Sequence, residues 1–397
     1  MESRENTRTQ STAVETSVLT TEQPTEHVET PARVIRVAQV IGATGCGGIE
    51  SVIMNYYRHI DRTKVQFDLF VNETSKIVTE EEVAALGGRI ILTPKITRHP
   101  FRYIRYMTEQ FLRGQYDIVH VNINALSVFP LLAAKRAGIP VRVLHNHSTW
   151  GRHEPLRNLV KMLLRPTAKW FATDYAACSQ RAAEWMYGKR KVKAGKVTVF
   201  NNAVDPSRFA FRPETRARIR EENGWEEDFI IGHIGRFMKQ KNHEFLVKIF
   251  AEVVKREPRA RLVLVGDGEL REKVMRQVEC LGLTGRVSFV GMVANPEDYY
   301  MAFDAFVLPS RYEGLPVVGV EAQATGLPCF FSEKVTREVL LTPGAKMLPL
   351  DSPAHWAEEI CACAPQSDRR DDTASIAAFD IREQGKQMAV YYESITR

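Results

Sequence analysis

Cysteine is scarce in this chain, and its spacing excludes two kinds of architecture. Six cysteines are scattered through 397 residues, and no two of them form a C-x-x-C pair. Disulfide frameworks and structural zinc sites both need cysteines at short, repeated spacings, so neither is predicted. We interpret the six side chains as reduced thiols, most of them buried, as expected in a cytosolic protein.

Long apolar runs are also missing. No run reaches the length of about 20 residues that a membrane-spanning helix needs. Residues 1–32 are rich in Thr, Glu, Ser and Gln and lack the apolar core of a signal peptide, so they are predicted to form a disordered tail. We therefore expect a cytoplasmic location, and peripheral contact with the inner face of the plasma membrane stays open.

An excess of one charge is the third absence. Lysine and arginine number 54 and aspartate and glutamate 48, which gives a net charge of +6. This excess is too small to predict nucleic-acid binding, although it permits attraction to anionic substrates or lipids. Residues 155–170 carry basic side chains at four-residue spacing, namely Arg157, Lys161, Arg165 and Lys169. The segment is either a helix lying on an anionic membrane or a solvated helix face packed on a sheet, and Pro166 should kink or end it.

What the chain does contain is a regular alternation of apolar strands and helical segments. Runs such as 34–41 and 141–144, and later 229–234 and 305–308, are each followed by a helical pattern. Alternating β and α segments predict parallel sheets covered by helices on both faces. We predict an α/β protein with two Rossmann-like, doubly wound parallel-sheet domains facing a central cleft. It would have six or seven strand–helix units and then about six more.

A polar connection separates the two series of units. We therefore divide the chain into the tail 1–32, a first domain 33–205 and a second domain 206–375. The final segment 376–397 is expected to form a helix that returns to the first domain.

The stretch 305–328 is the richest in candidate residues. Its strand leads into a loop with Glu313, and Pro316 suits the first turn of a helix that carries Glu321. Eight helical residues amount to about 800°, so both carboxylates can face one cleft. With the free N–H groups of the helix N-terminus, they would suit a sugar phosphate. The alternative is an ordinary β–α unit with two surface acids.

Two other loops have features of phosphate-binding elements. Gly47 and Gly48 lie in a glycine-rich loop between a strand and a helix, although the spacing is not G-x-G-x-x-G. Arg236 and Lys241 bracket a loop before another helix, where they are placed to clamp a diphosphate. The alternatives are a glycine turn for tight packing and two solvated cations.

Two histidines, His145 and His147, follow the apolar run 141–144. Strand carboxyl ends face the ligand crevice in open α/β sheets, and histidine is the commonest proton-transfer side chain. The alternative is a structural role in the first sheet.

In this order, the loops resemble those of retaining glycosyltransferases with the GT-B fold, the glycosyl transferases group 1 or family four. The resemblance covers nearly all of residues 34–397, and the run from Gly314 to Ala324 is most similar to bacterial exopolysaccharide and capsule enzymes. The family usually has Asn-Gly where this chain has Asn202-Ala203. The matching motifs are Gly47-Gly48-x-Glu50, His147-Ser148-Thr149, Asn202-Ala203-Val204-Asp205, Gly235-Arg236 with Lys241-Asn242, and Glu313-x7-Glu321.

The resemblance implies how a nucleotide diphosphate sugar would be held. Arg236 and Lys241 would bind the diphosphate, and Glu321 would bind the ribose hydroxyls. Gly47 and Gly48 would approach the diphosphate from the first domain, and Val290 and Gly291 would lie near the base.

It also implies contacts with the sugar under transfer. Glu313, with the amides of Gly314 and Leu315, would contact the donor sugar and a phosphate. His147 would point at the sugar ring, and His145 is the alternative if the alignment slips by two residues.

The activity implied by the resemblance is retaining transfer of a hexose to a lipid-linked or growing polysaccharide acceptor, with a UDP-sugar favoured as donor. No cofactor beyond this donor substrate is expected. The chain has no Asp-x-Asp motif, so metal-independent transfer is predicted. A nucleotide-sugar epimerase of the same fold and a non-catalytic sugar-nucleotide-binding protein are the alternatives, and the charged residues kept in each loop argue against the second.

Overall fold

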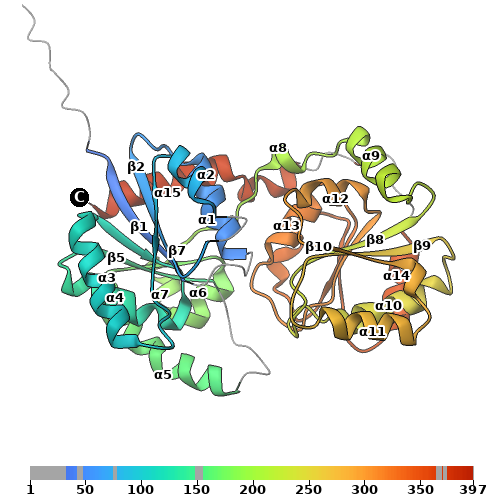
Figure 1. Cartoon of the computed structure of the whole chain (residues 1–397), viewed down its shortest axis with the longest axis horizontal. Coiled ribbons are helices and arrows are strands. Elements are labelled where there is room, and N and C mark those ends of the chain that lie inside the picture. Colours follow the sequence, from blue (N-terminus) through green and yellow to red (C-terminus); the bar gives the residue numbers. More distant parts are fainter. Residues whose placement is uncertain are drawn as a thin grey trace, which may run out of the picture. The chain divides into compact units, whose positions relative to one another are not determined.

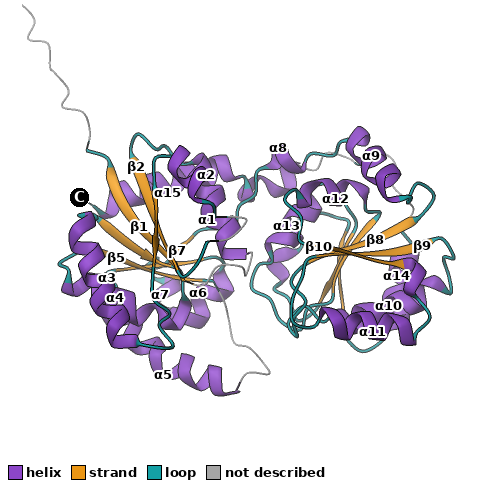
Figure 2. Ribbon diagram, in the orientation of Figure 1, coloured by secondary structure: helices purple, strands orange, loops and turns teal. Residues whose placement is uncertain are grey.

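The computed structural model describes residues 33–42, 48–74, 78–147, 155–363, 369 and 373–396. Val34–Arg397 forms one compact unit, which contains two parallel β-sheets (Figure 1). Helices cover both faces of each sheet (Figure 2). This confirms the predicted α/β class with two doubly wound, Rossmann-like halves.

The first sheet has seven strands in the order β3-β2-β1-β4-β5-β6-β7. Its strands are β1 (Ile35–Gly42), β2 (Val65–Val71), β3 (Arg89–Leu92), β4 (Ile118–Val121), β5 (Val141–Asn146), β6 (Asp174–Ala177) and β7 (Thr198–Val199). The helices in this part of the chain are α1 (Gly48–His59), α2 (Glu80–Ala85), α3 (Pro100–Gly114), α4 (Val128–Arg136), α5 (Pro155–Phe171), α6 (Gln180–Tyr187) and α7 (Lys189–Lys193), with a 3-10 turn at Asn124–Ser127.

The second sheet has six strands in the order β10-β9-β8-β11-β12-β13. Its strands are β8 (Phe229–Ile234), β9 (Ala260–Val265), β10 (Val287–Gly291), β11 (Ala305–Leu308), β12 (Cys329–Ser332) and β13 (Ala345–Leu348). The helices that follow residue 205 are α8 (Pro206–Phe209), α9 (Pro213–Asn223), α10 (His243–Val254), α11 (Arg271–Cys280), α12 (Pro296–Ala302), α13 (Val317–Ala324), α14 (Pro353–Cys361) and α15 (Ile381–Ile395), with 3-10 turns at Thr284–Arg286, Arg337–Val339 and Thr373–Phe379.

Each sheet has one point where the direction of strand order reverses. In the first sheet β1 lies between β2 and β4, and in the second β8 lies between β9 and β11. At such a switch point the loops at the carboxyl ends of adjacent strands diverge to opposite faces and leave a crevice that ligands use. The strand cores are buried on both sides, which is why β8 is apolar apart from His233 and has all six residues buried.

Helix α15 packs on the first sheet although it follows the second in sequence (Figure 1). Gly385 permits this contact, because a Cβ atom there would stand 3.1 Å from the carbonyl oxygen of His59 at the end of α1. Tyr392 is fully buried in the same core as Val37 and Phe67.

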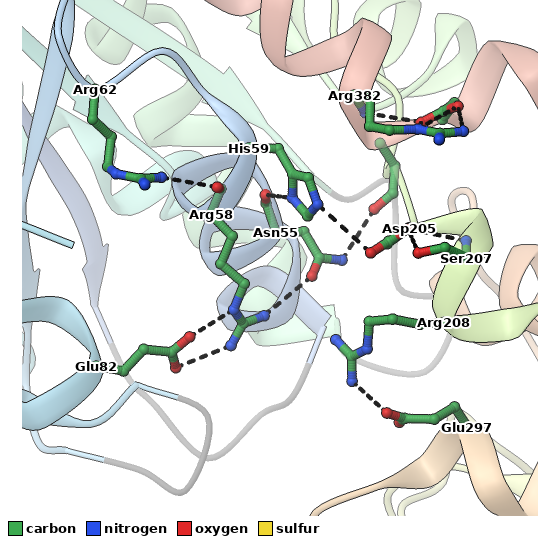
Figure 3. A network of polar contacts seen from close by, with 12 residues as sticks. Asn55, Arg58, His59, Arg62, Glu82, Asp205, Ser207, Arg208, Glu297 and Arg382 are labelled. Atoms are coloured by element: carbon green, nitrogen blue, oxygen red, sulfur yellow. Dashed lines mark hydrogen bonds and ion pairs between the residues drawn. The ribbon is translucent and has the colours of Figure 1, made fainter. Parts of the chain in front are cut away.

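The chain passes between the two sheets twice, near Val204 and again near residues 379–381. These two segments are hydrogen-bonded to each other. Val204 donates its N–H to the carbonyl of Phe379 and accepts the N–H of Ile381, each at 2.9 Å. Two side chains of helix α1 also contact the first of these segments (Figure 3). Asn55 Nδ2 lies 3.2 Å from the carbonyl oxygen of Ala203, and His59 Nε2 lies 3.6 Å from Asp205 Oδ2.

Two features differ from the sequence expectation. We expected Pro166 to kink or to end its helix. Helix α5 continues through Pro166, so an end at that proline is wrong. Pro166 has no N–H to donate to the carbonyl of Met162. Both residues are exposed, so water can donate to this carbonyl instead. Strand β12 was not predicted, because its three apolar residues directly follow the Gly326–Pro328 turn and show no period of their own.

Candidate functional site

Most of the predicted site residues lie at or just after the carboxyl ends of strands. Gly48 begins α1 after β1, and His147 follows β5. Arg236 and Glu313 follow β8 and β11, which are neighbours at the switch point of the second sheet. The loops of the two halves also meet, because a Cβ atom on Gly314 would stand 3.7 Å from the carbonyl oxygen of His147. Gly47 lies outside the described residues.

An ion pair between Lys241 and Glu313 joins the loops of β8 and β11. Lys241 Nζ lies 2.7 Å from Glu313 Oε1, with the two side chains 15% and 10% exposed. Glu313 Oε2 accepts a hydrogen bond from Gln240 at 2.8 Å, and Oε1 accepts one from Ser310 at 3.1 Å. Sequence reasoning named the cation and the carboxylate but missed Gln240 and Ser310. The only signal for these two residues in the sequence was their position on the same two loops as Lys241 and Glu313.

The backbone around this ion pair is held in an unusual conformation. Asn242, the N-cap of α10, has φ 60° and ψ 41°, and its Nδ2 donates to the carbonyl of Pro309 at 3.1 Å. Arg311 donates its N–H to the carbonyl of Gln240 at 2.8 Å. The N-terminal amides of α10 are therefore fixed beside Lys241, and together they form a positive site suited to an anion.

Glycines connect the end of β10 to this loop. Gly266 donates its N–H to the carbonyl of Gly291 at 2.8 Å. A Cβ atom on Gly266 would stand 2.3 Å from the carbonyl oxygen of Gly235, and φ there is +131°, so only glycine fits. Val290 and Gly291 are thereby placed next to the turn that carries Arg236, which is itself exposed.

Glu321 has a different environment from Glu313. It lies in α13, and its Oε2 accepts a hydrogen bond from the Tyr300 hydroxyl at 2.8 Å. Burial raises the pKa of Glu321 to about 7, although the Tyr300 hydrogen bond and the charge of Arg208 act in the opposite direction. The carboxyl group can therefore bind as an acid or as a carboxylate near neutral pH.

On the first sheet, His147 follows β5 whereas His145 lies inside it and is 3% exposed. The His147 Nε2 atom lies 2.9 Å from Asn122 Oδ1, and its main-chain N–H donates to Asn124 Oδ1 at 2.9 Å. Burial lowers the pKa of His147 to about 3, so the ring is neutral at physiological pH. The neutral ring can form a hydrogen bond with a hydroxyl group. It is not available as a charged imidazolium acid.

A hollow of about 700 Å³ lies at the opposite, amino-terminal end of β8, away from these residues. Its lining includes Arg216, Arg220 and Asp304, and the two guanidinium groups pair with the buried Asp304 carboxylate. These groups satisfy one another, so we assign them to the stability of the second sheet.

Solved structures with the same fold identify the architecture. The chain superposes on the crystal structure of Anabaena Alr3699/HepE in complex with UDP-glucose with a TM-score of 0.76, 19% identity and coverage of 91% of this chain and 100% of that one. For WaaG, a glycosyltransferase involved in lipopolysaccharide biosynthesis, the TM-score is 0.65 at 15% identity, with 91% and 98% covered. The fold is that of the GT-B glycosyltransferases.

Sequence comparison identifies the family. Residues 228–365 match the model described as glycosyl transferases group 1, and residues 46–208 match that of glycosyltransferase family 4. The putative glycosyltransferase EpsF of Bacillus subtilis (strain 168) is 34% identical over 368 residues, covering 90% of this chain and 96% of that protein. The chain belongs to the group 1, family 4 glycosyltransferases.

The environment of Glu321 predicts a pH-dependent stability. Its pKa is raised from 4.5 to about 7 in the folded chain, so the folded state retains a proton that the unfolded state loses. The stabilisation from this group is complete below about pH 4.5 and is lost as the pH rises to about 7. We therefore expect the stability of Glu321→Gln relative to the native chain to rise over this window, by about 3 kcal/mol at most.

Urea unfolding of both proteins at several pH values measures this difference. Glu333→Gln, at an exposed glutamate, serves as the control and should show no comparable slope. A difference between Glu321→Gln and the native chain that does not change with pH would contradict the raised pKa.

Proposed function

We propose that the protein is a retaining, metal-independent hexosyltransferase of cell-surface glycan synthesis. It would transfer the hexose of a nucleotide diphosphate sugar, with a UDP-sugar favoured, to a lipid-linked or growing polysaccharide acceptor. The observation that carries the proposal is the Lys241–Glu313 ion pair beside the N-terminus of α10. Support for the substrates comes from UDP-glucose in the HepE structure and from an Escherichia coli UDP-Gal:alpha-D-GlcNAc-diphosphoundecaprenol galactosyltransferase, 29% identical over 232 residues that span 55% of this chain and 58% of that protein.

In this proposal the second domain, 206–375, holds the donor. Lys241, Arg236 and the α10 amides bind the diphosphate, and Glu321 accepts hydrogen bonds from the ribose hydroxyls. The amides of Gly314 and Leu315 contact the sugar phosphate. Gly47 and Gly48 of the first domain, 33–205, approach the diphosphate, and Val290 and Gly291 lie near the base.

The reaction breaks the bond between the anomeric carbon and the phosphate oxygen, whose electron pair leaves with the diphosphate. Lys241 and Arg236 stabilise this departing charge. The acceptor hydroxyl attacks the same face of the sugar, and its proton passes to the leaving phosphate, so the anomeric configuration is retained. Glu313 is less suited to act as a covalent nucleophile because Lys241, Gln240 and Ser310 already occupy its two oxygens.

The products formed from the donor distinguish a glycosyltransferase from the two alternatives, an epimerase and a non-catalytic binding protein. A nucleotide-sugar epimerase would invert one carbon of the sugar, yield a product in which the sugar is still joined to the nucleotide, and need no acceptor. A non-catalytic binding protein would bind the donor and leave it unchanged. A donor panel of UDP-, GDP- and ADP-sugars, with and without glycan acceptor, separates the three activities when both free nucleotide diphosphate and the configuration of the nucleotide sugar are followed.

The ion pair predicts the effect of removing either partner. Lys241→Met and Glu313→Gln should each lower kcat by about 100- to 1,000-fold, because charge on the leaving diphosphate is no longer stabilised or positioned. Circular dichroism checks that the variants fold. EDTA should leave the native rate unchanged.

Lys334→Met is the matched control, since Lys334 pairs with the exposed neighbour Glu333. It should retain the native rate. Full activity in Lys241→Met or Glu313→Gln would refute the site assignment, and loss of activity on adding EDTA would refute metal independence alone.

We also propose that α5 lies on an anionic membrane surface. Met162, Leu163 and Trp170 on this helix are 52%, 64% and 75% exposed, and Lys169 lies among them. Apolar side chains that enter the lipid boundary beside a cation are the pattern of an interfacial helix. No helix among the residues that the structure describes is long and apolar enough to span a bilayer. A cytoplasmic location with peripheral contact at the inner face of the plasma membrane belongs to this proposal.

Removing the apolar side chains should weaken this contact. We expect the double variant Leu163→Ser/Trp170→Ser to lose most of its co-sedimentation with vesicles rich in phosphatidylglycerol, with donor turnover in solution unchanged. Leu281→Ser, at an exposed leucine after α11, is the control. Equal sedimentation of the native chain and the double variant would exclude α5 as the contact.

A further inference from the structure

Six buried or partly buried polar side chains form one continuous hydrogen-bonded chain inside the first half of the protein. It starts at His147 and ends at His145, and its fourth member, Tyr392, is on the closing helix α15. Successive members lie 2.9, 3.0, 2.9, 2.6 and 2.9 Å apart in the order His147, Asn122, Gln39, Tyr392, His120 and His145.

The chain has a defined direction. Asn122 Nδ2 lies 3.0 Å from Gln39 Oε1 and 3.4 Å from the carbonyl oxygen of His120, which can only accept. The amide nitrogen therefore faces these two acceptors, and Asn122 Oδ1 faces His147. An amide oxygen only accepts, so His147 carries its proton on Nε2 and keeps a lone pair on Nδ1.

The rest of the chain is consistent with this direction. Gln39 uses its Oε1 to accept from Asn122, so its Nε2 donates to the Tyr392 hydroxyl. The hydroxyl hydrogen of Tyr392 is then left for His120 Nδ1. His120 donates in turn from Nε2 to Nδ1 of His145.

All three imidazole rings are neutral, which the directional chain requires. Burial lowers the pKa of His120 and of His147 to about 3 and that of His145 well below its ordinary value. A neutral ring has one donor and one acceptor, so each tautomer fixes the next. The two ends also meet, because the His145 and His147 rings stack with centroids 4.0 Å apart.

We propose that Tyr392 is a positioning residue for His147: through Gln39 and Asn122, its hydroxyl holds His147 as the Nε2–H tautomer, with Nδ1 left to accept a hydrogen bond from a hydroxyl of the donor sugar. The sugar contact rests on the proposed function, whereas the tautomer does not. The closing helix thereby sets the chemistry of a site residue without touching it.

The experiment removes the hydroxyl alone. Tyr392→Phe keeps the ring in contact with Phe67, whose centroid is 6.1 Å away, and leaves Gln39 without its acceptor. Long-range ¹H–¹⁵N correlation spectra of the full chain with ¹⁵N-labelled histidine report each tautomer. We expect a single Nε2–H form of His147 in the native chain and a mixture of tautomers in the variant. The value of kcat/KM for donor turnover should fall about fivefold, the equivalent of one hydrogen bond.

Tyr391→Phe is the matched control, because the buried Tyr391 hydroxyl has no hydrogen-bond partner among the residues that the structure describes. It should change neither the spectrum nor the rate. Gln39→Met, which interrupts the chain at another member, should reproduce the effect of Tyr392→Phe and replaces it if that variant fails to fold.

An Nδ1–H form of His147 in the native chain would overturn the proposal. So would a single unchanged tautomer in both Tyr392→Phe and Gln39→Met. A tautomer change without transfer from any donor would refute the proposed function and leave the positioning role intact.

Discussion

The site in the second half depends on one ion pair. Lys241 and Glu313 come from the loops after β8 and β11, two strands that are neighbours only because the strand order reverses there. Gln240, Ser310 and Asn242 fix both loops around the pair by hydrogen bonds. In the proposed function, a diphosphate bound here would compete with Glu313 for the ammonium group. The ion pair keeps Lys241 ordered and partly neutralised, which would limit the reorganisation needed on donor binding.

Three neutral histidines give the first half a different electrostatic character. Burial keeps His120, His145 and His147 uncharged, so this side of the site contributes directional hydrogen bonds where the other contributes charge. Such a division suits a substrate with an anionic part and a sugar rich in hydroxyl groups. In the proposed function, sugar recognition by neutral groups would also avoid adding positive charge beside an oxocarbenium-like centre.

Local patterns predicted most of the fold and the loops that carry most of the candidate site residues. The strand Ala305–Leu308 and the loop with Glu313 were recognisable because a buried parallel strand is an unbroken apolar run and its loop follows directly. Asn122 and Tyr392 were not recognised as part of the site. Asn122 lies 25 residues before His147 in sequence, and Tyr392 lies far after it. Only the parallel pairing of β4 with β5 and the packing of α15 bring the three residues together. Hydrogen bonds over such separations leave no periodic signal in one sequence.

The position of α15 also has a consequence for biosynthesis. The core around Val37, Phe67 and Tyr392 is completed by residues near the end of the chain, although its strands emerge from the ribosome first. At about 5–20 residues per second, the early strands must wait for many seconds with the groove for α15 uncovered. The apolar side chains that α15 covers are exposed to water during this time, so burial of the core of the first half is completed only when α15 packs on it.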